Sequence, residues 1–185
     1  MDEMKTSNMS WNKQLSQELD LLIARKRSNA PTSKPSLRLK VAVVGAGSEL
    51  NGDDAAGLWV VRGLNRTLQS SPHFLSIEAG VVPENALGPL RKFRPDVVIL
   101  IDAADFGEEP GVIRWVENTQ IDGFSASSHT LPLGMISSYI SGELACPIWL
   151  IGVQPASLEF AEPLTESVQR SVDNLITELT RLFER

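Results

Sequence analysis

Residues 39–54 read LKVAVVGAGSELNGDD, and this stretch decides the fold. The β-branched and apolar run from Leu39 to Val44 stops at a glycine-rich turn, as a buried strand does when it leaves its sheet. Asp54 then opens an amphipathic helix predicted over residues 54–68, with acids in its first turn, where the helix dipole favours negative charge. A strand, a tight turn and a helix in this order indicate an α/β fold.

Strands and helices continue to alternate along the rest of the chain. The sequence predicts strands at residues 74–79, 97–101, 112–116 and 148–153, and helices at residues 83–93, 130–141 and 163–183. Only residues 103–111 separate the strands at 97–101 and 112–116, which is too short for a parallel crossover, so we expect these two strands to run antiparallel. The chain therefore predicts an α/β domain with a five-stranded, mostly parallel sheet flanked by helices.

The N-terminal part has a different character. Apolar residues between Trp11 and Lys26 recur at helical spacing, which predicts one amphipathic helix, and residues 28–36 are typical of a loop. We therefore divide the chain into an N-terminal extension, residues 1–38, and an α/β domain, residues 39–185. The helix could dock on the domain or bind a partner, and docking is favoured because several of its leucines need cover.

Composition and charge exclude several classes of function. The chain has 185 residues, enough for one domain with a sizeable core. Its net charge of −6 disfavours a nucleic-acid partner, which requires a concentrated basic face. The single cysteine, Cys146, excludes an internal disulfide framework and a cysteine-rich metal site. Because no apolar run can span a bilayer and no signal-peptide core is present, we expect a cytoplasmic protein without membrane insertion.

The glycine-rich turn suggests a nucleotide site, but its details disagree with one. Gly45 and Gly47 match the start of a dinucleotide fingerprint, whereas the third glycine, Gly52, comes two positions late. A P-loop requires Lys-Ser or Lys-Thr after Gly52, and this chain has Asp53-Asp54. Two carboxylates at a helix N-terminus repel phosphate, so nucleotide binding is disfavoured.

A cation site is the alternative. Asp54, Asp102 and His129 offer two carboxylates and one imidazole, a set that suits nickel, zinc or iron. Open coordination positions would remain for substrate or water. Each residue also has a structural alternative, since Asp53 or Asp54 could cap the helix. Asp102 could hold a neighbouring loop through backbone N–H groups, and His129 could be a capping or surface histidine.

Nucleophilic catalysis has weaker support. Cys146 precedes a proline at the start of an apolar strand, which is typical of a buried structural thiol. Ser127 and Ser128 adjoin His129, and neighbours in sequence seldom form a working serine–histidine pair. The remaining histidine, His73, lies in a polar turn, and we expect it to be exposed.

Five segments carry a family resemblance: GSELNGDDAAG (47–57), AGVVPENALGPLRKFRP (79–95), ILIDAADFGEEPG (99–111), SHTLPL (128–133) and IGVQP (151–155). In these segments and their order, the chain resembles the nickel–iron hydrogenase maturation endopeptidases, above all the formate-hydrogenlyase (hydrogenase-3) type. The elements Pro-Glu-Asn, Asp-Ala-x-Asp and Gly-x-Gln-Pro coincide in one chain, which makes the resemblance specific. Ser48 and Ala55 stand where the family usually has asparagine and glycine. These differences bear on the geometry of the loop and on the choice of partner more than on the chemistry.

The resemblance implies a three-layer α/β sandwich and a peptide-bond hydrolase of the aspartyl-type endopeptidase family. Carried over position by position, the family's metal-contacting and catalytic residues match Asp54, Asp102 and His129. The implied activity is removal of the C-terminal extension of a hydrogenase large-subunit precursor that already carries nickel. No cofactor is expected to be bound permanently, because the nickel belongs to the substrate.

Two other functions stay open at this point. The same fold could be a non-catalytic, nickel-dependent binding or chaperone module for the large subunit, which would bind the precursor without shortening it. It could also be a free-standing metallopeptidase with its own ion, although three candidate ligands make a permanently held metal less expected. We expect a monomer, because the large subunit must reach an exposed site.

Overall fold

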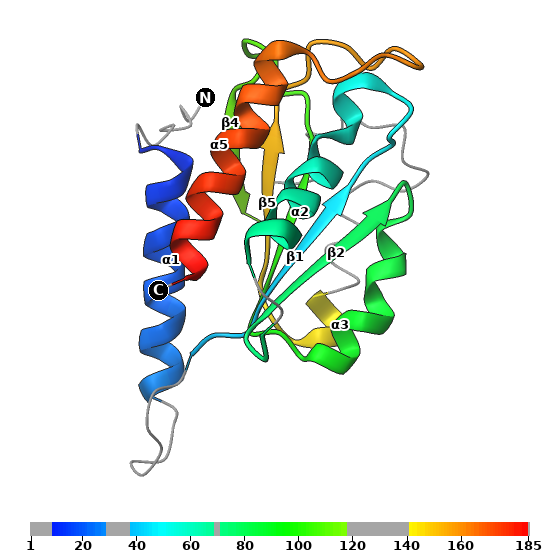
Figure 1. The fold of residues 1–185 in the computed structure, drawn as a ribbon. Coiled ribbons are helices and arrows are strands. Elements are labelled where there is room, and N and C mark those ends of the chain that lie inside the picture. Colours follow the sequence, from blue (N-terminus) through cyan, green and yellow to red (C-terminus); the bar gives the residue numbers. More distant parts are fainter. Residues whose placement is uncertain (1–8, 29–37, 69–70, 118–140, 185) are drawn as a thin grey trace, which may run out of the picture.

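The computed structural model describes residues 9–28, 38–68, 71–117 and 141–184, which form a five-stranded sheet flanked by helices (Figure 1). The strands are β1 (Val41–Ala46), β2 (Phe74–Gly80), β3 (Val97–Ala103), β4 (Ile113–Glu117) and β5 (Ile148–Val153). Their order across the sheet is β2-β1-β3-β5-β4, and every neighbouring pair is parallel except β5 and β4. The predicted five-stranded, mostly parallel sheet is confirmed.

The predicted helices within the described residues are also present. They are α1 (Trp11–Ser28), α2 (Ala56–Thr67), α3 (Leu87–Phe93) and α5 (Glu166–Phe183), with the 3₁₀ turns η1 (Gly52–Ala55) and η2 (Pro83–Ala86) leading into α2 and α3. The helix predicted at residues 130–141 lies outside the described residues except for its last position, and residues 141–144 are helical. Among the helices that the structure describes, none combines the length and apolar character needed to cross a bilayer.

Both faces of the sheet are covered, which makes three layers. On one face, α1, α2 and α5 pack against alternate side chains of the central strands, such as Ile99 and Ile151. On the other face, Leu90 of α3 packs with the intervening side chains, such as Leu100 and Leu150. Successive side chains of a strand point to opposite faces, so the continuous apolar runs of β1, β3 and β5 support a helical layer on each side.

β4 is the antiparallel strand at one edge of the sheet. The prediction that it runs antiparallel to β3 is confirmed, but the two are not neighbours, because β5 lies between them. Trp115 of β4 packs against Trp149 of β5, with ring centroids 4.7 Å apart. An aromatic contact therefore reinforces the backbone pairing at this edge.

The N-terminal helix docks on the domain. α1 lies beside α5, in blue and red in Figure 1, and the Asn12 side chain donates a 2.9 Å hydrogen bond to Glu178 across this contact. Leu15 and Leu19 are buried in the same core cluster as the central strands. These two leucines thus have the cover that we expected several leucines of the helix to need. The loop predicted at residues 28–36 lies outside the described residues, apart from its first position.

Leu15→Ala is expected to lower the free energy of unfolding by about 2–5 kcal/mol, because the side chain is fully buried and its removal leaves a cavity. Leu21→Ala is the matched control, since Leu21 lies on the same helix and is 50% exposed; it should change stability by less than about 0.5 kcal/mol. Urea unfolding measures both values. Equal stability of the two variants would contradict the docking of α1.

Candidate functional site

Two buried carboxylates lie at the edge of the sheet where β1 and β3 end. Asp102 is near the end of β3 and is 0% exposed; Asp54 is in η1, between β1 and α2, and is 1% exposed. β1 and β3 are neighbours, with Gly45 paired to Ile101, so both acids belong to this edge. Open α/β sheets bind their ligands at the carboxyl ends of strands. The structure therefore brings together two of the three predicted site residues.

Two glycines allow the backbone to approach closely at this edge. Gly47 has a φ of +122°, a conformation that glycine adopts readily, and a Cβ there would lie 1.7 Å from the Asp54 carbonyl oxygen. A Cβ at Gly57 would lie 2.2 Å from the Ile101 carbonyl oxygen. The first turn of α2 thus rests on the residue before Asp102, and this contact sets the position of Asp54 next to the end of β3.

Both acids accept hydrogen bonds from nearby backbone. Asp54 Oδ2 accepts the Ser48 N–H at 2.8 Å, and Asp102 Oδ1 accepts the Ala103 N–H at 2.9 Å. Charge-assisted bonds of this kind orient a carboxylate. Asp54 is not a capping residue, because Asn51 precedes η1, Ala55 precedes α2, and neither start has a side-chain cap. The helix-capping alternative for Asp54 is therefore wrong.

His129, the third predicted residue, lies outside the described residues, as do Ser127 and Ser128. Within the described ranges, no group of three or more His, Cys, Asp or Glu side chains is placed to hold a metal ion. Asp54 and Asp102 supply hard oxygen donors that can ligate a cation or accept a proton. A complete coordination set would need further donors, from His129 or from a bound substrate.

The neighbouring acid, Asp53, has a structural task. Its carboxylate is 0% exposed and accepts hydrogen bonds from the N–H groups of Ala156, Ser157 and Thr165 and from the Thr165 hydroxyl, at 2.7–3.1 Å. Thr165 precedes α5, so the carboxylate also lies where the helix dipole favours negative charge. The prediction that Asp53 could cap the helix that follows it in sequence is wrong, because its partners lie 103 to 112 residues further along the chain. No local sequence pattern signals such a contact.

Gln154, in the Gly-x-Gln-Pro element, organises the loop that follows β3. Its buried side chain accepts the Phe106 N–H at 2.7 Å and donates to Asp105 at 3.1 Å. The Gly107 N–H and the Gln154 side chain, in that order of importance, lower the pKa of Asp105, partly offset by desolvation. The element therefore fixes residues 105–108 of the loop that follows Asp102 and has a structural role beside the site.

Cys146 is buried, as its position before a proline predicted. Burial, with a smaller contribution from the negative charge of Asp96, raises the pKa of its thiol to about 11. The thiolate is the reactive form of cysteine, so burial disfavours this side chain as a nucleophile at neutral pH.

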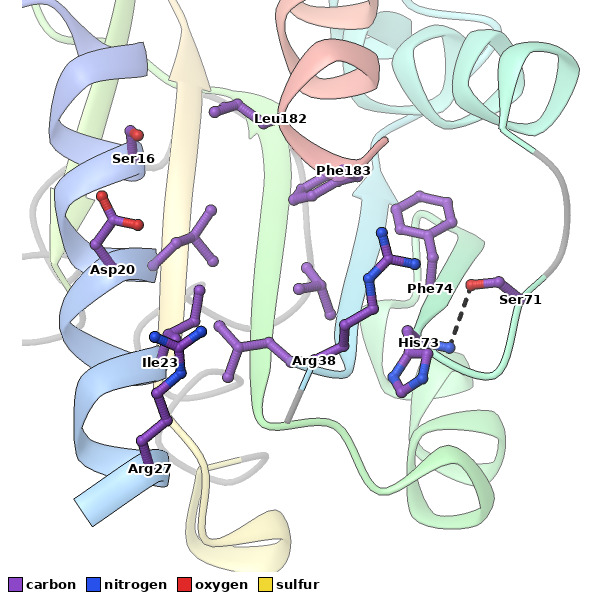
Figure 2. A pocket seen from close by; sticks show the side chains of 13 residues that line it. Ser16, Asp20, Ile23, Arg27, Arg38, Ser71, His73, Phe74, Leu182 and Phe183 are labelled. Atoms are coloured by element: carbon purple, nitrogen blue, oxygen red, sulfur yellow. Dashed lines mark hydrogen bonds between the residues drawn. The ribbon is translucent and has the colours of Figure 1, made fainter. Parts of the chain in front are cut away.

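A pocket of about 330 Å³ lies at the opposite end of the sheet (Figure 2). It is enclosed by α1, by the starts of β1 and β2 and by the end of α5, with Arg38 and Phe183 in its lining. His73 lines it too and is half-buried, and its Nδ1 is buried without a hydrogen-bond partner among the described residues. The prediction that His73 is exposed is wrong, because helices distant in sequence enclose its turn. Neither Asp54 nor Asp102 lines this pocket.

Known proteins share both the sequence pattern and the fold. The family model HycI, hydrogenase maturation protease, matches residues 58–182. Over 151 residues the chain is 32% identical to a Methanocaldococcus jannaschii protein that is named as a hydrogenase maturation protease. The match covers 78% of this chain and 89% of that one. Over 136 residues it is 29% identical to the hydrogenase 3 maturation protease of Escherichia coli K12, with 72% and 84% covered.

A solved structure extends the likeness to three dimensions. The crystal structure of the NiFe hydrogenase maturation protease HycI from Thermococcus kodakarensis matches with a TM-score of 0.73 at 30% identity, covering 81% of this chain and 96% of that one. The fold and these matches define an enzyme that hydrolyses peptide bonds. Within that class, the chain belongs to the hydrogenase maturation protease family, as the sequence resemblance predicted.

Asp53→Ala is expected to lower the free energy of unfolding by roughly 2–5 kcal/mol, because three backbone N–H groups and one hydroxyl lose a charged acceptor. Asp173→Ala is the matched control, an exposed acid on α5 that accepts one side-chain bond from Gln169. Urea unfolding compares the two. A loss no larger than that of the control would show that Asp53 does not hold the loop.

At about pH 8, Cys146 is expected to react with iodoacetamide about 100-fold more slowly in the native protein than in the urea-unfolded chain. The reason is that a pKa of about 11 in place of 9.0 reduces the thiolate fraction about a hundredfold at that pH. Because the chain has one cysteine, mass spectrometry of the labelled protein reports on this residue alone. Equal rates in the two states would refute the assignment of a buried, inert thiol.

Proposed function

We propose that this enzyme removes the C-terminal extension of a hydrogenase large-subunit precursor after nickel has been inserted into it. The observation that carries the proposal is the pair of buried carboxylates, Asp54 and Asp102, at the carboxyl edge of the parallel sheet. His129 completes the proposed set. Membership in the hydrogenase maturation proteases supplies the reaction class, and one relative is named for hydrogenase 3.

In this proposal the nickel is part of the substrate. Asp54, Asp102 and His129 contact it with two carboxylate oxygens and an imidazole, a donor set that suits this ion. A precursor without nickel would bury the two carboxylates on binding without supplying a cation. Such binding is unfavourable, because buried negative charges repel each other. Electrostatics would then let the enzyme select precursors that already carry the metal.

The same contact would assist hydrolysis. A bound metal ion polarises a carbonyl oxygen or makes a bound water more acidic, so nickel close to the scissile bond would activate it. One of the two carboxylates accepts the proton of the attacking water as general base. The proton then passes to the leaving amine as the peptide bond breaks.

Two alternatives make different predictions for the purified components. A non-catalytic reader of nickel-loaded subunits would bind the precursor and leave its mass unchanged, which disagrees with membership in a protease family. A free-standing metallopeptidase would carry its own ion, which metal analysis of the purified protein detects. We propose that the enzyme acts as a monomer, so that the large subunit can reach the edge that carries Asp54 and Asp102.

Asp54→Asn, Asp102→Asn and His129→Ala are each expected to slow processing of the nickel-loaded precursor by at least about 100-fold, the typical contribution of an acid–base or ligand group. Asparagine keeps the size of the side chain and one oxygen, but it cannot accept the proton as a carboxylate does. Intact mass of the precursor over time gives the rate, and thermal unfolding checks that each variant is folded.

Asp173→Asn is the matched control for these variants. Asp173 is an exposed acid on α5, and its substitution should leave the rate within about 2-fold of the wild type, as surface changes away from a site usually do. Full processing by folded Asp54→Asn or Asp102→Asn would refute the proposed role of the two carboxylates in cleavage.

A further inference from the structure

Exposed apolar side chains gather at the edge of the sheet that carries Asp54 and Asp102. Among the described residues, the large apolar side chains that are at least 37% exposed are Met9, Leu21, Leu50, Trp59, Val81, Val82, Leu158 and Phe160. Five of these eight lie on the loops that follow β1, β2 and β5. Single exposed apolar residues are normal on a protein surface, whereas a group on neighbouring loops indicates an interaction site.

Backbone hydrogen bonds join these three loops. The Gly47 N–H donates to the Gly80 carbonyl at 3.0 Å and connects the loops after β1 and β2. The Ala161 N–H donates to the Leu50 carbonyl at 2.7 Å and connects the loops after β1 and β5. Figure 1 shows the orange segment after β5 reaching over the cyan turn after β1. We call this surface the apolar rim, defined as Leu50, Val81, Val82, Leu158 and Phe160.

The loop that carries Leu158 and Phe160 is held in a set conformation. Asp53 binds the two ends of the loop through Ala156 and Thr165. Ala161, next to the 71% exposed Phe160, has a φ of +63°, which costs energy for an L-residue and persists only where surrounding contacts impose it. A preset loop loses little conformational entropy when a partner binds, so the loop is suited to present its apolar side chains.

Acidic residues border the apolar rim. Glu159 and Glu162 are exposed on the same loop, and residues 155–165 include no lysine or arginine. The surface therefore matches a partner with an apolar patch bordered by basic side chains. A second copy of this chain fits less well, since a symmetric contact through this loop would bring like charges together.

We infer that the apolar rim is the docking surface for the folded body of the large-subunit precursor, beyond the peptide that is cut. This inference rests on the proposed function, because it names the surface that holds the same substrate. The rim borders the edge with Asp54 and Asp102, so a protein that brings a peptide bond to these acids must cover it. Phe160 is the side chain best placed to act as an anchor, since it is the most exposed of the five and phenylalanine is enriched at protein interfaces.

The test compares the double variant Leu158→Ser/Phe160→Ser with Leu21→Ser, both in the full chain. Leu21 is the matched control, because it is 50% exposed and lies on α1. Calorimetry measures the Kd for a nickel-loaded hydrogenase large-subunit precursor, and intact mass follows its processing separately. We expect the Kd of the double variant to rise by about 10-fold or more, and that of the control by less than about 2-fold. Thermal unfolding should be similar in all three proteins, because the substituted side chains are exposed.

The outcomes separate this inference from the proposed function. An unchanged Kd in the double variant would overturn the inference, whether or not the precursor is cleaved. Binding that depends on the apolar rim but produces no shortened precursor would support the docking surface and refute the proposed hydrolysis. A dimer of this chain that the double variant loses, with unchanged affinity for the precursor, would overturn the inference by assigning the rim to a second copy. Absence of any binding by the wild type would overturn it as well.

Discussion

The buried carboxylate of Asp53 connects two loops on which the proposed site depends. It binds the loop between β5 and α5 at both ends, while the next residue, Asp54, accepts the Ser48 N–H within the turn after β1. Close backbone contact at Gly57 sets this turn against the end of β3. Two consecutive acids thus have separate tasks: the first builds the edge of the sheet and supports the apolar rim, and the second contributes to the proposed chemistry. Charge-assisted bonds to a buried carboxylate suit the first task, because they are both strong and directional.

Local sequence patterns were sufficient to predict most of the elements. β5 has the predicted bounds, Ile148–Val153, because an unbroken apolar run between turn residues leaves little choice of boundary. The helix predicted from Asp54 instead begins as a 3₁₀ turn at Gly52, where the Asp53 N–H bonds the Ser157 carbonyl. The positions of Asp54 and Asp102 at one edge follow from strands that run parallel, and this could be predicted as well.

Contacts between distant segments could not be predicted in the same way. The insertion of β5 between β3 and β4, the enclosure of His73 by α1 and α5, and the partners of Asp53 all depend on residues far apart in the chain. A single sequence contains no periodicity that reports such contacts. The apolar rim could not be predicted for a related reason. Leu50 and Phe160 come close together only when the chain folds, through the hydrogen bond from the Ala161 N–H to the Leu50 carbonyl.

We propose that cleavage by this enzyme requires nickel in the precursor. The most direct test is the intact mass of a large-subunit precursor after incubation with the purified protein, in two samples that differ only in whether nickel has been inserted. We predict loss of a short C-terminal peptide in the nickel-loaded sample alone. Equal processing of both samples would contradict the requirement for nickel, and an unchanged mass in both would contradict the proposed hydrolysis.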